Sequence, residues 1–144
     1  MERTWLITGC SSGLGKGIAK AVLARGDRAA LTARDPAALA AFTAAYPGRA
    51  LALPLDLSCA DSIPRAVAET QRAFGGIDVL VNNAGIFSFC DILDTPAERI
   101  ERIILLHDLT NTQLCRMAAA DMVRRGCRGH ILNMSSYSLW MPFP

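Results

Sequence analysis

A glycine-rich stretch near the start of the chain has the residue types of a phosphate-binding loop. It reads Thr8-Gly9-Cys10-Ser11-Ser12-Gly13-Leu14-Gly15 and lies between a short apolar run and a segment of helical periodicity. Glycines at such a turn let the backbone approach a diphosphate without a Cβ in the way, and helix N-terminal amides carry partial positive charge toward it. This position favours a phosphate site over the alternative, a glycine-rich turn that binds nothing.

Polar residues that could contact a ligand also follow three later apolar runs. Asp56 follows the third run, where an acid taken alone is more typical of helix capping. Asn82-Asn83-Ala84-Gly85 follows the fourth run, and by itself it is compatible with an Asx turn. Ser135 and Ser136 follow the fifth run. Because ligands of open parallel sheets bind at the carboxyl ends of the strands, these residues are candidates for one site.

The elements that must position these residues are short apolar runs, which alternate with longer segments of helical periodicity. This alternation is typical of βαβ units and predicts a parallel sheet. The predicted strands are Thr4–Thr8, Ala29–Ala33, Ala50–Leu55, Ile77–Val81 and Ile131–Met134. Right-handed crossovers between them predict an α/β fold, a doubly wound parallel sheet with helices on both faces that is truncated after about its fifth strand.

Helices are predicted between the strands. The first reaches about Arg25, and its apolar face is predicted from recurrence at three and four residues. That face contains Leu14, Ile18, Ala21, Val22 and Arg25. Asp35-Pro36 predicts an N-cap with proline at the first helical position, and Gly75-Gly76 predicts the end of a later helix. Residues 96–125 form a long helical stretch with a break near His107.

Length and composition favour one domain over residues 1–144. Of the 144 residues, 51% are hydrophobic and 19% charged, which allows a buried core without disulfides or metal. The net charge of +2 is spread along the chain and leaves no basic stripe for nucleic acid or an anionic membrane. The five cysteines are far apart, with no Cys-x-x-Cys and no metal-ligand spacing. We therefore expect free thiols, no metal site and a cytoplasmic protein, since neither a leader nor a membrane span is recognised.

The glycine spacing departs from the common dinucleotide fingerprint Gly-x-Gly-x-x-Gly, because three residues separate its first two glycines. The pattern Thr-Gly-x-x-x-Gly-x-Gly resembles the short-chain dehydrogenase/reductase family. Asp56, the Asn-Asn-Ala-Gly motif and the serine pair occur in the order and context of that family, so the resemblance extends from Thr4 to Ser136. It implies a Rossmann fold that binds a nicotinamide dinucleotide.

The resemblance assigns cofactor contacts by position in three segments. The implied contacts are Gly9, Ser11, Ser12, Gly13, Leu14, Gly15, Arg34, Asp56, Leu57, Asn83, Ala84 and Gly85. In the family, the loop serines lie beside the adenosine phosphates and the acid accepts a hydrogen bond from the adenine amino group. The backbone of the Asn-Asn-Ala-Gly motif lines the cofactor, and its asparagine ties adjacent strands together.

The end of the second predicted strand bears on the choice between NADP and NAD. An acid there would accept from the ribose 2′-hydroxyl of NAD, whereas an arginine can pair with the 2′-phosphate of NADP. The sequence reads Leu31-Thr32-Ala33-Arg34-Asp35, and Arg34 falls where NADP-preferring members carry their arginine. We therefore expect NADP, with NAD as the weaker candidate. The alternative is a solvated Arg34 beside a helix-capping Asp35.

Catalysis in the family uses a serine, a tyrosine with a lysine four residues later, and an asparagine in the helix after Asn-Asn-Ala-Gly. Ser136, the second of its pair, matches the serine. The tyrosines and lysines of the sequence are Tyr46, Tyr137, Lys16 and Lys20. None of them forms Tyr-x-x-x-Lys, so we expect that pair beyond Pro144 and an inactive chain without it.

The asparagine position is occupied by His107 or Asp108, since Asn111 lies three or four residues too late. His107 could relay a proton and is the second candidate catalytic residue. A lone histidine on a helix is nevertheless more often a packing or capping residue.

Three functions remain open from the sequence. The first is an NAD(P)-dependent oxidoreductase that transfers hydride between nicotinamide and a small alcohol or carbonyl substrate. The second is a dinucleotide-binding module without catalysis, and the third is an inert truncation product. Because the fifth strand would present an open edge, we also expect self-association as a homo-oligomer.

Overall fold

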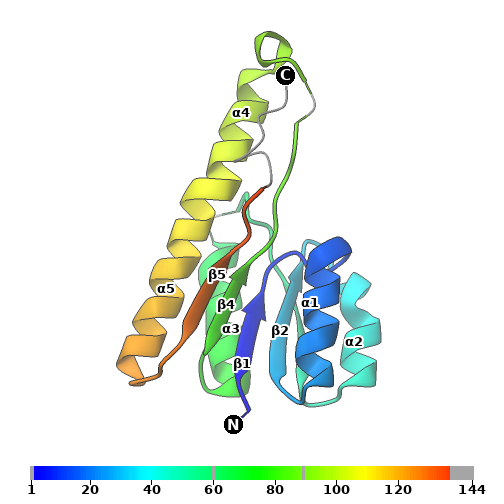
Figure 1. The fold of residues 1–144 in the computed structure, drawn as a ribbon, viewed down its shortest axis with the longest axis vertical. Helices are drawn as coiled ribbons and strands as arrows, with labels where there is room; N and C mark the ends of the chain where they lie inside the picture. Colours follow the sequence, from blue (N-terminus) through cyan, green and yellow to red (C-terminus); the bar gives the residue numbers. More distant parts are fainter. Residues whose placement is uncertain (1, 60, 89, 137–144) are drawn as a thin grey trace.

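Five parallel strands form one sheet in the computed structural model, which describes residues 2–59, 61–88 and 90–136 (Figure 1). They are β1 Thr4–Ile7, β2 Arg28–Ala33, β3 Ala50–Pro54, β4 Val79–Asn82 and β5 His130–Asn133. Their order in the sheet is β3-β2-β1-β4-β5, so the winding direction reverses between β1 and β4. The predicted doubly wound sheet is confirmed, and ligands of such sheets bind at this reversal.

Helices connect the strands across both faces of the sheet (Figure 1). They are α1 Gly13–Ala24, α2 Ala40–Ala45, α3 Ser62–Phe74, α4 Ala97–Ile104 and α5 Thr110–Arg124. Short 3₁₀ helices cover Pro36–Leu39 and Ile92–Asp94. A π-helix, Leu105–Leu109, joins α4 to α5 without interruption, so the helical stretch is irregular near His107 but is not broken there as predicted.

The strands divide their side chains between two hydrophobic layers, as the alternation of a β-strand requires. Leu6 of β1 and Leu80 of β4 pack with buried residues of α3 and α5. On the opposite face, Ile7, Val79 and Val81 pack with buried residues of α1. A strand covered on both faces is apolar throughout, which is why the fourth apolar run is continuous in the sequence.

The buried face of α1 differs from the predicted one. Leu14 is 58% exposed, and Ala21 and Arg25 are exposed as well, whereas Val22 is buried as expected. The residues that face the sheet are Gly15, Ala19, Val22 and Leu23. The prediction followed recurrence at three and four residues starting from Leu14, but the face that meets the sheet begins with the small residues Gly15 and Ala19.

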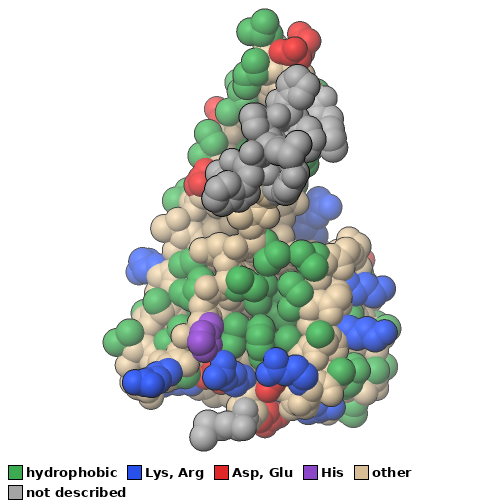
Figure 2. Space-filling view, in the orientation of Figure 1, with side chains coloured by type: hydrophobic (Ala, Val, Ile, Leu, Met, Phe, Trp, Pro, Cys, Tyr) green, Lys and Arg blue, Asp and Glu red, His purple; other side chains and the backbone are tan. Residues whose placement is uncertain are grey.

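Exposure separates β5 from its neighbour β4. All four residues of β5 are exposed, Leu132 at 48% and Ile131 at 38%, whereas all four residues of β4 are buried. Within the described ranges β5 pairs with β4 on one side only, so it is an edge strand there. Figure 2 shows hydrophobic side chains gathered over the middle of the face turned to the viewer.

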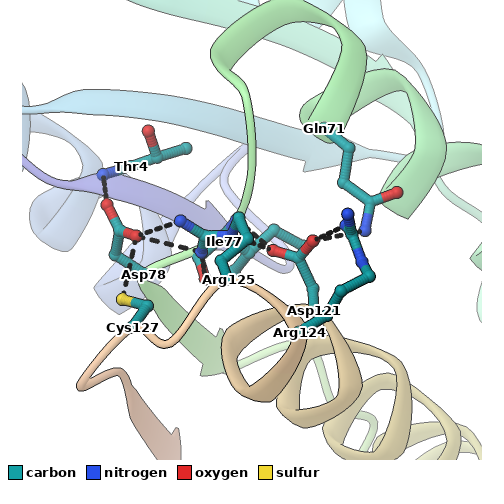
Figure 3. A network of polar contacts seen from close by, with 8 residues as sticks. All are labelled: Thr4, Gln71, Ile77, Asp78, Asp121, Arg124, Arg125 and Cys127. Carbon is teal, nitrogen blue, oxygen red and sulfur yellow. Dashed lines mark hydrogen bonds and ion pairs between the residues drawn. The ribbon is translucent and has the colours of Figure 1, made fainter.

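A polar network fixes α5 to the amino end of β4, at the opposite end of the strands from the loops described below (Figure 3). Asp121 of α5 is buried and accepts hydrogen bonds from the Ile77 amide and from Arg125 Nε, both at 2.8 Å. Arg125 Nη1 also donates to Asp78 Oδ1 at 3.0 Å, and Asp78 accepts from the Thr4 amide at 2.9 Å. Burial alone would raise the pKa of both carboxyls, but the backbone amides and Arg125 outweigh it and lower both pKa values. Both groups are therefore carboxylates at neutral pH.

Candidate functional site

The turn between β1 and α1 has no room for a side chain at Gly9 or at Gly15. Gly9 has a φ of +71° and Gly13 a φ of +56°, a left-handed conformation that glycine adopts readily. A Cβ on Gly9 would lie 3.0 Å from the Cα of Ala84, and a Cβ on Gly15 would lie 2.2 Å from the Gly9 carbonyl oxygen. The N-cap Ser12 makes no side-chain capping bond, so the first amides of α1 remain able to bind an anion.

Thr8 and Asn83 lock this turn against the segment that follows β4. The Thr8 hydroxyl is buried and accepts hydrogen bonds from the amides of Asn83 and Ala84, both at 2.9 Å. In return, Asn83 Nδ2 donates to the carbonyl oxygens of Thr8 at 2.9 Å and Gly9 at 3.2 Å. Asn82 reaches the other way, with Nδ2 donating to Asn133 Oδ1 of β5 at 2.8 Å. The two asparagines thus tie β4 to both of its neighbours.

A cavity of about 350 Å³ lies at the carboxyl ends of β1, β2, β3 and β4. The implied cofactor contacts that line it are Gly9, Ser11, Ser12, Arg34, Asp56, Leu57, Asn83, Ala84 and Gly85. Gly13 and Gly15 shape the turn without lining the cavity, and Leu14 lies in a second hollow described below. The structure therefore brings together residues that are as much as 76 positions apart in the sequence, from Gly9 to Gly85.

Asp56 does not cap α3, whose N-cap is Asp61, so the helix-capping interpretation is wrong. Its Oδ1 instead accepts from the hydroxyl of Ser58 at 2.6 Å and from the Ser58 amide at 2.9 Å, which forms a local Asx turn. These two hydrogen bonds lower the pKa of Asp56, and the positive charges of Arg34 and Arg102 lower it further. Asp56 is therefore ionised at neutral pH and acts only as an acceptor.

Arg34 and Asp35, directly after β2, have different surroundings. Arg34 is exposed and lines the cavity. Asp35 Oδ1 accepts from the amide of Ala37 at 2.9 Å and caps the turn that begins at Pro36, so the predicted cap is confirmed. The capped turn is 3₁₀ before it continues as α2. Asp35 thus caps the turn, while its neighbour Arg34 lines the cavity.

A second hollow of about 780 Å³ adjoins the cavity and shares Asn83, Gly85 and Ile86 with it. Ser136, which follows β5, and His107, from the π-helix, both line this hollow. Asn111 lines it as well, although it lies too late in the sequence for the family's asparagine. One helical turn separates Asn111 from His107, and its Nδ2 donates to the His107 carbonyl at 3.0 Å. Both predicted catalytic residues therefore face the same space.

The His107 ring is held by the segment after β4. Its Nε2 lies 2.9 Å from the Ile86 carbonyl oxygen and 3.2 Å from the Ile86 amide nitrogen. A Cβ on Gly85 would lie 2.7 Å from the ring carbon Cε1, so glycine is what allows the ring to approach. These contacts are those of a packing residue, and a proton relay through His107 remains a prediction.

Comparison with known proteins assigns the chain to a family. A family model described as short chain dehydrogenase matches residues 3–144. The chain belongs to the short-chain dehydrogenase family. Sorbitol dehydrogenase of Cereibacter sphaeroides is 34% identical over 93% of this chain and 52% of its own length. D-beta-hydroxybutyrate dehydrogenase of Cupriavidus necator is 35% identical over 93% of this chain and 53% of its length.

Solved structures agree with this assignment. A short-chain dehydrogenase from Streptomyces avermitilis matches with a TM-score of 0.93 and 37% identity, over 99% of this chain and 52% of that one. The 3-ketoacyl-(acyl-carrier-protein) reductase of Brucella melitensis, solved in complex with NADH, matches with a TM-score of 0.90 and 29% identity, over 99% of this chain and 60% of that one. The chain spans about half the length of these short-chain dehydrogenase relatives.

Six residues that line the cavity were not predicted as cofactor contacts: Thr32, Ala33, Leu55 and Ile86, which lie within two residues of predicted contacts, and Arg102 and Leu106, which come from another segment. Arg102 of α4 and Leu106 of the π-helix line the cavity beside the residues that follow the strands. The motifs that identified the other cavity residues lie in loops, and no sequence motif marks the helix residues Arg102 and Leu106. The four-residue spacing of Arg102 and Leu106 places them on one helix face, but the sequence does not show which way that face turns.

Within residues 2–59, 61–88 and 90–136, no helix is long and apolar enough to cross a membrane. Over the same residues, no group of three or more histidine, cysteine or acidic side chains could hold a metal ion. Tyr137 and the residues after it lie outside the described residues.

Proposed function

We propose that residues 1–144 form a dinucleotide-binding Rossmann domain that holds NADP across the carboxyl ends of β1 to β4. The observation that carries this proposal is the turn at Gly9 to Gly15. It packs so closely that Gly9 and Gly15 have no room for a Cβ, presents the first amides of α1, and opens into a cavity that also contains Asp56 and Arg34. The residues present therefore fit the group.

Each part of the cavity would hold a different part of the nucleotide. The α1 amides with Ser11 and Ser12 would bind the phosphates next to the adenosine. Asp56, as an ionised acceptor, suits the adenine amino group. Arg34 has no hydrogen bond or ion pair with any other described residue, and its fork of donors suits the 2′-phosphate of NADP.

The proposed reaction transfers hydride between nicotinamide and a small alcohol or carbonyl substrate, and the bound cofactor supplies the redox chemistry. Ser136 would polarise the substrate oxygen from the second hollow. His107 would hold the Gly85–Ile86 segment through Nε2 and is the candidate for moving a proton at that atom. Because the family's Tyr-x-x-x-Lys is absent from these 144 residues, we propose that this chain binds cofactor without turnover on its own.

Titration of the purified chain with NADPH tests the proposal. Saturable binding with enhanced nicotinamide fluorescence, reversed by competing 2′,5′-ADP, is the expected result. Absence of saturation, together with a fluorescent dye binding to exposed apolar surface, would instead identify an inert truncation product.

A binding module without catalysis is the second candidate function. The coding sequence beyond Pro144 separates the two: a Tyr-x-x-x-Lys there would favour the oxidoreductase, and a continuation without that pair would favour the module.

We also propose a cytoplasmic location and self-association through β5. All five cysteines are free thiols. Burial raises the pKa of Cys10 to about 12, so that thiol beside the phosphate loop stays protonated and unreactive. The open edge of β5 supplies unpaired backbone groups for a second copy.

A further inference from the structure

Arg102 brings a second guanidinium to the cavity, from a different element than Arg34. It lies in the last turn of α4, is exposed, and lines the cavity together with Arg34 and Asp56. Among residues 2–59, 61–88 and 90–136, no hydrogen bond or ion pair holds either guanidinium. Both charges nevertheless act on Asp56, since both help to lower its pKa. Within those ranges the donors of Arg102 are thus uncommitted, and they belong to the same cavity as Asp56.

The cavity has a polar part and an apolar part, and Arg102 belongs with the apolar part. The polar part contains Gly9, Ser11 and Ser12 of the phosphate loop, beside β2 and Arg34. The apolar part is built from buried leucines on two segments, together with Ile86. Those leucines are Leu55, Leu57 and Leu106. Leu106 lies one helical turn after Arg102, on the same helix face.

The helix segment that carries Arg102 is fixed to the loop that carries Asp56. Thr110, which follows the π-helix, is buried, and its hydroxyl contacts the carbonyl oxygens of Leu57 at 3.0 Å and Leu105 at 2.8 Å. The first contact ties α5 to the residue next to Asp56, and the second closes the wide turn. Arg102 is therefore held at a set position relative to the Asp56 loop, although its own side chain is exposed.

We propose that Arg102 binds the adenine ring, with its planar guanidinium stacked on one face of the base while Asp56 accepts a hydrogen bond from the edge. A flat, weakly hydrated guanidinium stacks on aromatic faces, and nucleic-acid bases are bound in this way by arginine. An apolar slot next to the guanidinium suits a base better than it suits a phosphate. The inference rests on the proposed cofactor site and names a contact within it.

Two adenine nucleotides separate stacking from phosphate binding. Calorimetric titration with 5′-ADP and with 2′,5′-ADP should show that Arg102→Ala weakens both by the same factor, about fivefold. Arg102→Lys, which keeps the charge and loses the plane, should not restore binding. Arg34→Ala should weaken 2′,5′-ADP alone. The matched control is Arg128→Ala, an exposed arginine directly before β5 at the other end of the strands.

The outcomes distinguish this inference from the proposed function. If the unaltered chain binds neither nucleotide, both proposals are overturned. If it binds both and Arg102→Ala binds equally well, only the Arg102 contact is overturned. A loss confined to 2′,5′-ADP, or full rescue by Arg102→Lys, would make Arg102 a phosphate ligand and would also overturn stacking. A circular dichroism spectrum of each variant, matching that of the unaltered chain, shows that the fold is retained.

Discussion

The adenosine end of the candidate site and the end that carries Ser136 differ in how far the described residues enclose them. At the adenosine end, the loop after β1 is locked by Thr8 and Asn83 between buried strands. At the other end, Ser136 follows a strand whose residues are all exposed. The proposed nucleotide site therefore depends on contacts made within these residues, whereas the proposed reacting end is built on an edge strand.

The largest effect on stability is expected at the polar network that joins α5 to the amino end of β4. Asp121→Ala removes the acceptor for Ile77 and Arg125 and should lower the free energy of unfolding by about 3 kcal/mol. Urea unfolding measures it, with Val123→Ala as control, because Val123 lies on the same helix at 80% exposure. If hydrogen exchange shows that Asp121→Ala lowers amide protection at only one end of the site, the two ends do not both depend on the Asp121 network.

The same network predicts a pH dependence. The pKa values of Asp78 and Asp121 lie below the ordinary 3.8, so their contribution is complete above that pH and is lost as the pH falls through the lowered values. Acid unfolding followed by circular dichroism should therefore be less steep in Asp121→Asn than in the unaltered chain. Parallel acid-unfolding curves would contradict this assignment.

Adding a side chain at a crowded glycine of the phosphate loop should disrupt the enclosed end of the site. Gly15→Ala places a Cβ against the Gly9 carbonyl and Asn83, so it should destabilise the fold by about 1–3 kcal/mol and weaken NADPH binding at least about tenfold. Gly17→Ala is the matched control, since a Cβ there meets nothing within 4 Å. That variant should be neutral or stabilising by up to about 1 kcal/mol. Equal behaviour of the two variants would refute the close approach of α1 to the loop.

Cofactor preference tests the enclosed end more finely. Arg34→Glu should weaken NADPH binding at least about tenfold more than NADH binding, because it replaces a phosphate partner by a like charge. Arg128→Glu makes the same charge change away from the cavity and controls for the overall field. Equal losses for both cofactors would show that Arg34 does not bind the 2′-phosphate.

The smallest effect on stability is expected at the open end. Leu132→Lys alters a half-exposed residue of β5 and should change the free energy of unfolding by no more than about 0.5 kcal/mol. A lysine beside an edge strand discourages pairing between copies, so sedimentation velocity should show less self-association. Association that persists unchanged would locate the contact elsewhere.

The general plan of the fold could be predicted from the sequence, because alternating runs and right-handed crossovers leave few arrangements for five strands. Loop residues of the site were predictable as well, since each follows a strand. The orientation of helices was not. Leu14 was predicted on the buried face from its spacing, whereas the contact depends on Gly15 being small. Arg102 was not predicted to line the cavity, because the sequence does not show which way its helix face turns.

Long-range polar contacts could not be predicted from the sequence either. Asp121 and Arg125 stand four residues apart, which is typical of a surface ion pair on a helix. In the structure the pair is instead the centre of a partly buried network that reaches Ile77 and Asp78. Spacing shows which residues share a helix face, but only packing shows what that face meets.

The wide turn at Leu105–Leu109 takes up one residue more than a regular turn of α-helix. Successive residues of a regular helix are about 100° apart, so an extra residue that was not absorbed would rotate everything after it by that angle. The wide turn absorbs the surplus, and Leu114, Ala118 and Met122 beyond it lie in the core. Deleting a single codon here would restore even winding and leave those three side chains facing the sheet, whereas a deletion within α5 would rotate the residues after it away from the core. Gaps in the wide turn should therefore be more tolerable than gaps within α5.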